Sequence, residues 1–273
     1  MESNTLGVRG SWVTLVVAGS LLAGCSAQGA DGGSPPRAGS RTHTATPEPA
    51  ARPSGGASAA PAFTPDAGLV PRTPKEGRDL VGAVVFAPGD WGRRFVAQDP
   101  AESTPGTWAV LDDDCRWERR KLPRGVLASL SRYSGLPAGS GKGAVKVTAA
   151  ATTHSSVLGA DEQLSTTLEE VLRCPEQQPR ADARITGLNS LGTPFGAREQ
   201  DYADDSVLEA GQYVGKGGDA QPYLWMVARL GTVIVAVSVT GGKGHTEPEL
   251  QQLGATALGQ MLGRVQQRLK EKK

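Results

Sequence analysis

Apolar and polar residues alternate along several segments of the chain, and this alternation predicts β-strands. In Val145–His154 the apolar residues occupy every second position, as in a strand with one buried face. Tyr223–Arg229 and Thr232–Thr240 are apolar on both faces and are joined by Leu230-Gly231, so they predict a hairpin that contains a central strand. Further strands are expected at 183–190, 206–214, Thr107–Leu111 and Leu80–Phe86.

Three other segments carry apolar residues at helical spacing. The last of them starts at the capping box Thr246-Glu247-Pro248-Glu249 and keeps one apolar stripe as far as Leu269. A second helix is expected to be capped by Asp161 and to end at Cys174-Pro175. Pro123 fits the first turn of a third helix, which would end near Tyr133.

These elements together predict the fold class. Strands joined by short connections favour an antiparallel sheet, and the helices can then gather on one side of it. We therefore expect an α+β domain over residues 79–273, with a sheet of about five to six strands and two to three helices on one face.

The composition before residue 79 is different. Residues 25–78 are rich in Pro, Gly, Ser and Ala, and their large apolar residues are Phe63, Leu69 and Val70, which are too few to bury a core. This segment is expected to be a disordered linker.

The whole chain carries a formal net charge of +1, so it lacks the large positive charge that is typical of a nucleic-acid-binding protein, and no nucleic-acid partner is expected.

Residues 1–24 have the layout of a signal peptide. The apolar run Trp12–Ala23 is too short to span a bilayer but suits a signal-peptide core. The sequence Leu22-Ala23-Gly24-Cys25 resembles the bacterial lipobox. This resemblance implies cleavage before Cys25 and attachment of a diacylglyceryl (palmitate-type) anchor to its thiol, which would hold the protein at the extracytoplasmic face of the cell membrane. The alternative is an ordinary secretory signal with a chance cysteine.

The chain has 3 cysteines. If Cys25 is acylated, only Cys115 and Cys174 remain, and an oxidising compartment favours a disulfide between them. The alternative is two free thiols, one of which could be catalytic.

The cysteine-bearing segments also carry a wider resemblance. Trp108–Trp117, Leu168–Cys174 and Arg229–Ala236 resemble segments of surface lipoproteins of the Streptomyces type. The layout is more distantly similar to the extracellular sensor domain of mycobacterial PknH-type kinases. That resemblance implies an antiparallel sheet with helices, a disulfide near a helix end, and a groove that binds a ligand, but it assigns no ligand residues here.

The sequence shows no catalytic, metal or cofactor signature. Gly139–Gly143 lacks the spacing of a phosphate-binding loop, and Gly187–Gly192 lacks one glycine of a nucleophile elbow around Ser190. His154 and His245 stand far apart, without the spacing of a metal pair. The acidic clusters Asp112-Asp113-Asp114 and Asp201, Asp204, Asp205 suit solvated loops, although a weak calcium site or a pair of hydrolytic carboxylates stays open.

Trp91, Trp108 and Trp117 lie close together in a chain that is only 5% aromatic. They are either binding residues or core residues around the disulfide. The sequence therefore predicts a non-enzymatic binding or sensing module at the cell envelope, with an envelope ligand or a membrane protein as partner. An envelope-directed hydrolase and a structural scaffold are the alternatives.

Overall fold

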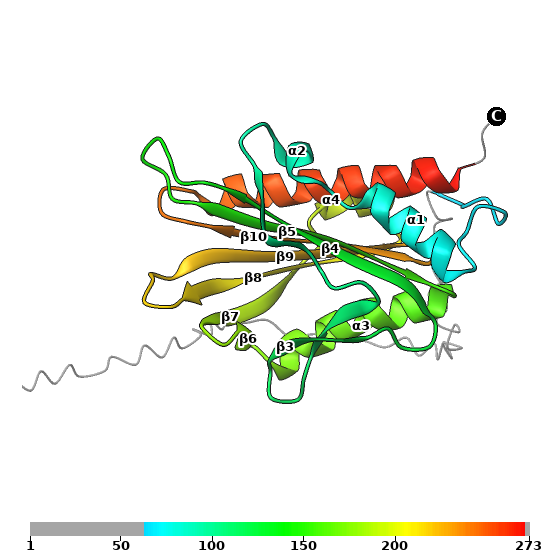
Figure 1. The fold of residues 1–273 in the computed structure, drawn as a ribbon, viewed down its shortest axis with the longest axis horizontal. Coiled ribbons are helices and arrows are strands. Elements are labelled where there is room, and N and C mark those ends of the chain that lie inside the picture. The colour runs from blue at the N-terminus through cyan, green and yellow to red at the C-terminus, as the bar shows by residue number, and fades with distance from the viewer. Residues whose placement is uncertain (1–62, 271–273) are drawn as a thin grey trace, which may run out of the picture. The chain divides into compact units, whose positions relative to one another are not determined.

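The computed structural model describes residues 63–270, which are built around one large antiparallel sheet (Figure 1). Its strands are β1 (Val96–Glu102), β4 (Val126–Leu136), β5 (Val145–His154), β6 (Gln177–Arg180), β7 (Ala183–Gly192), β8 (Asp205–Gly215), β9 (Gln221–Leu230) and β10 (Val233–Gly241). The eight strands lie in the order β1-β4-β5-β10-β9-β8-β7-β6. A separate hairpin pairs β2 (Thr107–Leu111) with β3 (Trp117–Lys121).

The predicted central strand is β10, which lies between β5 and β9. Val235 is opposite Ala151 on one side and Ala228 on the other. Eight of its nine residues are buried, because both faces of the sheet are covered at this point. The hairpin through Leu230-Gly231 and the strands at 145–154, 183–190 and 206–214 are confirmed.

One face of the sheet is covered by two long helices, α4 (Glu247–Leu269) and α1 (Pro74–Val84). Thr246 caps α4 through the predicted capping box with Glu249. The short helix α2 (Pro88–Trp91) and the 3₁₀ helix η1 (Gly196–Asp201) complete this side. No helix within residues 63–270 has the length and apolar character that a membrane crossing needs.

The opposite face is covered by α3 (Val157–Arg173), as Figure 1 shows. Its N-cap is Ser156 and not the predicted Asp161. Ala160 and Leu164 pack on Val207, Val227 and Ile234 of the sheet. Leu172, near the end of α3, is 84% exposed.

Several sequence predictions about the fold are wrong. The sheet has eight strands and not five to six, and the helices lie on both faces and not on one. Residues 126–133, predicted as helix, belong to β4. The apolar residues there fit both the helical and the strand spacing. Hydrogen bonding to β5 along Val126–Leu136 makes this segment a strand.

A further error concerns Leu80–Phe86, which was predicted as a strand. Most of this segment is the end of α1, and Leu80, Val81 and Val84 face the core at helical spacing. The helix begins inside the range assigned to the linker, at the capping box of Thr73 and Glu76 with Pro74 in the first turn. The same signal identified α4, so α1 could have been predicted from it.

Candidate functional site

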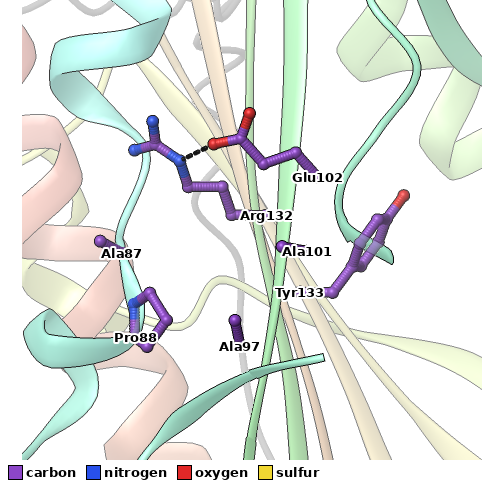
Figure 2. A pocket seen from close by; sticks show the side chains of 7 residues that line it. All are labelled: Ala87, Pro88, Ala97, Ala101, Glu102, Arg132 and Tyr133. Atoms are coloured by element: carbon purple, nitrogen blue, oxygen red, sulfur yellow. Dashed lines mark hydrogen bonds and ion pairs between the residues drawn. The ribbon is translucent and has the colours of Figure 1, made fainter. Parts of the chain in front are cut away.

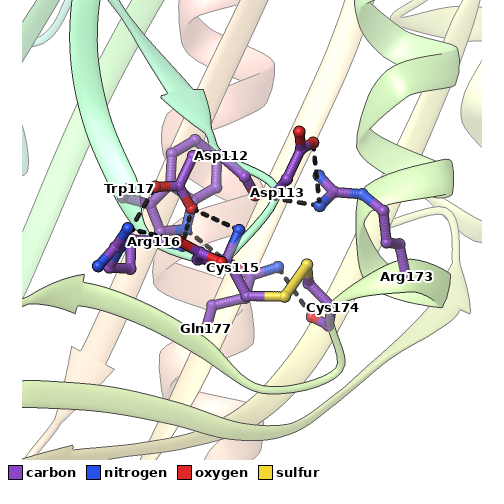
Figure 3. The surroundings of a disulfide bond; sticks show 9 residues. Asp112, Asp113, Cys115, Arg116, Trp117, Arg173, Cys174 and Gln177 are labelled. Atoms are coloured by element: carbon purple, nitrogen blue, oxygen red, sulfur yellow. Dashed lines mark hydrogen bonds and ion pairs between the residues drawn. A yellow bond between two sulfur atoms is a disulfide. The ribbon is translucent and has the colours of Figure 1, made fainter.

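The structure joins Cys115 and Cys174, whose Cα atoms are 5.6 Å apart (Figure 3). Cys115 lies in the turn between β2 and β3 with a φ of 60°, and Cys174 directly follows α3. Asp112 shapes the turn, because its carboxylate accepts hydrogen bonds from the backbone N–H groups of Asp114 and Arg116. The pair expected from the cysteine count therefore fixes the β2–β3 hairpin to the end of α3.

Polar contacts strengthen the same junction. The indole N–H of Trp117 donates to Gln177 Oε1 at 2.7 Å, and Gln177 Nε2 donates to the carbonyl oxygen of Cys174. The backbone N–H of Gln178 donates to the carbonyl oxygen of Cys115. The hairpin, α3 and β6 are thus held together by one covalent link and several hydrogen bonds.

The three tryptophans proposed as binding residues do not gather around one cavity. Trp91, in α2, is 8% exposed and packs edge-on against Phe86, with ring centroids 5.3 Å apart. Trp108 and Trp117 lie on the β2–β3 hairpin and are half-buried. Trp91 is therefore part of the core, and Trp117 is bound into the disulfide junction.

The two histidines within residues 63–270 lie at opposite ends of β5. His154 is its last residue, is buried, and forms a hydrogen bond of 2.7 Å with Gln163 of α3. Burial lowers the pKa of His154, so the fold favours the neutral ring. His245 precedes α4 and contacts the carbonyl oxygen of Gly143, two residues before the start of β5. The two rings cannot act on one substrate or metal ion.

The remaining sequence candidates are parts of loops and strand edges. Asp204 binds Arg229 at 2.9 Å and also accepts from the backbone N–H of Gly231. Gly139–Gly143 is a turn from which Lys142 reaches Glu249. Ser190 is exposed near the end of β7. Residues 63–270 contain no cluster of three or more His, Cys, Asp or Glu side chains arranged to hold a metal ion. Cys25 lies outside the described residues.

An open pocket of about 250 Å³ lies at the β1–β4 edge (Figure 2). Its charged residues are Arg132 and Glu102, which form an ion pair of 2.7 Å. Arg132 also donates to the carbonyl oxygen of Val85. Because the guanidinium already has these partners, an anion binding here would have to displace Glu102.

A second, larger groove of about 350 Å³ lies over β7, β8 and β9, beside the first residue of α4. Its apolar lining comes from Ala210, Pro222 and Leu224, and Leu191 adds an apolar side chain that is largely exposed. Its polar lining is mostly neutral and comes from Thr186, Asn189 and Gln212, with the carboxylate of Glu247 at one end. An apolar surface with a few neutral hydrogen-bonding groups suits an uncharged polar ligand.

On the opposite face of the sheet, the sequence analysis missed two carboxyl groups, the buried Glu209 and the half-buried Glu170. Glu209 of β8 is 2% exposed, and burial, with repulsion from Glu170, raises its pKa to about 8. Burial raises the pKa of Glu170, in α3, to about 7. Glu209 could have been found from the sequence, because it shares a strand face with the apolar residue Val207.

No protein-family model and no curated protein sequence matches this chain. Among solved structures, an uncharacterized protein of Mycobacterium smegmatis, described as an Rv0999 ortholog, is 12% identical. The similarity covers 62% of this chain and 90% of the other, with a TM-score of 0.31. This likeness is too weak to assign a fold family or a function, so the candidate site rests on the geometry of the chain itself.

Proposed function

We propose that the chain is an extracytoplasmic lipoprotein, anchored through Cys25, whose folded domain binds an uncharged glycan of the cell envelope without catalysing a reaction. The anchor is supported by the lipobox-like sequence Leu22–Cys25 and by the Pro-rich segment that follows it. The observation that carries the binding role is the 350 Å³ groove over β7–β9.

The lining of the groove motivates the choice of ligand. Ala210, Pro222 and the largely exposed Leu191 offer an apolar surface for the C–H face of a sugar ring. The carboxamides of Asn189 and Gln212 both donate and accept hydrogen bonds, as sugar hydroxyl groups require. The Nδ2 group of Asn189 donates to the carbonyl oxygens of Gly187 and Ala210, which fixes the orientation of this side chain.

The hydrolase alternative could draw on Glu170 and Glu209, because a carboxyl group with a raised pKa is a common general acid in glycoside hydrolysis. However, Glu209 lies beneath α3 on the face of the sheet opposite the groove, and its 2% exposure leaves no access for a substrate. These two carboxyl groups therefore give the hydrolase alternative no support.

Titration with uncharged oligosaccharides released from the cell wall, followed by calorimetry, tests the binding role. Gln212→Trp places a large ring at the groove and should abolish saturable binding, whereas Gln252→Trp on the exposed face of α4 should leave it intact. Failure of all such fragments to bind, or equal binding by both variants, would contradict the proposal.

The anchor is tested separately. Cys25→Ala should release the protein from the membrane fraction and remove the acylated mass. A variant that still fractionates with membranes and carries the same lipid mass would exclude this anchor.

A further inference from the structure

The side chain of Glu209 is enclosed by three elements. It points from β8 toward α3, and its cross-strand neighbours are Ser190 on β7 and Trp225 on β9. Within residues 63–270, its Oε1 atom is fully buried and has no hydrogen-bond partner. A buried ionised carboxylate without a donor is costly, so this environment favours the protonated, neutral form.

The second carboxyl group comes from the helix that covers Glu209. Glu170 lies in the last turn of α3 and is close enough to Glu209 to raise its pKa by charge repulsion. The backbone N–H of Leu111, in β2, and the guanidinium of Arg173 favour the charged form of Glu170, but burial outweighs both. The two glutamates therefore place like charges on the two sides of the α3–sheet interface whenever both are ionised.

The other charged groups described near this face lie toward the two ends of α3. Toward the start of α3, Arg229 pairs with Asp161 and Asp204, and near Arg229 burial raises the pKa of Asp205. At the far end, Arg180 donates to the hydroxyl group of Tyr213.

Two further groups act near the glutamates. Arg173 donates to the carbonyl oxygen of Asp112. Burial raises the pKa of Tyr223 on β9, with a smaller contribution from Glu209, so this phenol stays neutral. Among the described groups, Arg173 is the cation that acts on the pair, and it does so through Glu170.

The interface that contains the pair is small. The buried residues of α3 are Ala160, Leu164 and Val171, whereas α4 buries eight residues against the other face. A helix with few buried apolar contacts opens at lower free energy than the rest of the fold. The link from Cys174 to Cys115 ties the end of α3 to the β2–β3 hairpin, so the two would loosen together.

We propose that Glu170 and Glu209 form a proton-dependent latch, which holds α3 and the β2–β3 hairpin on the sheet when the pair is protonated and releases them when both groups are charged. The latch would control access to the α3-covered face of β7–β10. It is independent of the groove, which lies on the other face.

The direction of the effect follows from linkage. Each carboxyl group has a folded-state pKa above its unfolded value, so the docked state has its full stability below the unfolded pKa of about 4.3. This stability is lost as the pH rises toward 7 and 8, the pKa values of Glu170 and Glu209 in the fold. The closed form is therefore the acidic form, and the open form is the alkaline one.

Hydrogen exchange measured by mass spectrometry between pH 5.5 and 9, corrected for the intrinsic effect of pH, tests the latch. The opening equilibrium of amides in α3 should rise by up to roughly ten-thousandfold over this range, with about 1.5 decades from Glu170 and about 2.5 from Glu209, while that of α4 stays nearly constant. Glu209→Gln should remove most of the rise. Glu169→Gln, which changes an exposed acid on the same helix, should retain it.

Near-UV circular dichroism establishes that each variant is folded. Glu170→Gln provides a second neutral variant and should also reduce the rise. The proposal is overturned if α3 and α4 respond equally to pH, if the wild-type exchange of α3 is independent of pH, or if both neutral variants keep the full dependence.

Discussion

The Cys115–Cys174 link allows a quantitative prediction, because it closes a long loop. The two residues are separated by 59 positions, and the loop contains β4, β5 and α3. A cross-link of this span reduces the entropy of the unfolded chain, and the chain-entropy relation gives about 4 kcal/mol of stabilisation at 25 °C. The double substitution Cys115→Ala and Cys174→Ala should remove most of it.

The free energy of unfolding is measured with urea for the wild-type and double-variant domains. A loss of about 4 kcal/mol corresponds to a decrease in melting temperature of roughly 8–16 °C for a domain of this size. Alanine is preferred to serine because Cys174 is completely buried, and a hydroxyl group there would be placed among apolar neighbours. The m-value should rise, because the unfolded chain of the variant exposes more surface.

Reduction of the wild-type protein provides the matching control. Dithiothreitol should destabilise the wild type by a similar amount and leave the alanine variant unchanged. Two results would show that the disulfide is absent: an unfolding curve of the wild type that reduction does not change, or alkylation of both thiols by iodoacetamide in the unreduced native protein. The stabilisation calculated from the disulfide would then not apply.

Two further predictions concern buried side chains. Met261→Ala in α4 truncates a side chain that is 0% exposed and should lower the free energy of unfolding in urea by about 2–5 kcal/mol. Gln260→Ala, at the exposed neighbouring position, should change it by less than about 0.5 kcal/mol. Equal effects of the two substitutions would show that α4 is not packed as described. NMR titration of the His154 ring should give a pKa below 6.5, because burial favours the neutral form. Since the folded pKa lies below the unfolded one, this group stabilises the fold above pH 6.5, and its contribution is lost as the pH falls. A His154 pKa at or above 6.5 would refute this prediction.

Local signals in the sequence predicted several elements correctly. The capping box at Thr246 located α4, and the alternation in Val145–His154 located β5. The cysteine count selected Cys115 and Cys174, which meet in the structure. Each of these features depends on neighbouring residues or on simple counting, and no knowledge of distant contacts was needed.

The errors arose where long-range contacts decide between two local possibilities. Residues 126–133 fit a helix or a strand, and pairing with β5 makes them β4. The position of α3 on the opposite face from α4 also could not be read from its own sequence, because an apolar stripe shows that a helix is covered but not by which face of the sheet.

The sequence by itself determined the chemistry available to this protein: a lipobox-like start, a Pro-rich linker, a pair of cysteines and an alternating pattern that requires a sheet. Only the tertiary structure decided how those groups are used. It moved Trp91 into the core, formed a mostly neutral groove from three strands, and buried Glu209 beneath α3. The reason is that burial and the approach of like charges depend on residues far apart in the chain, which meet only when the sheet and its helices pack together.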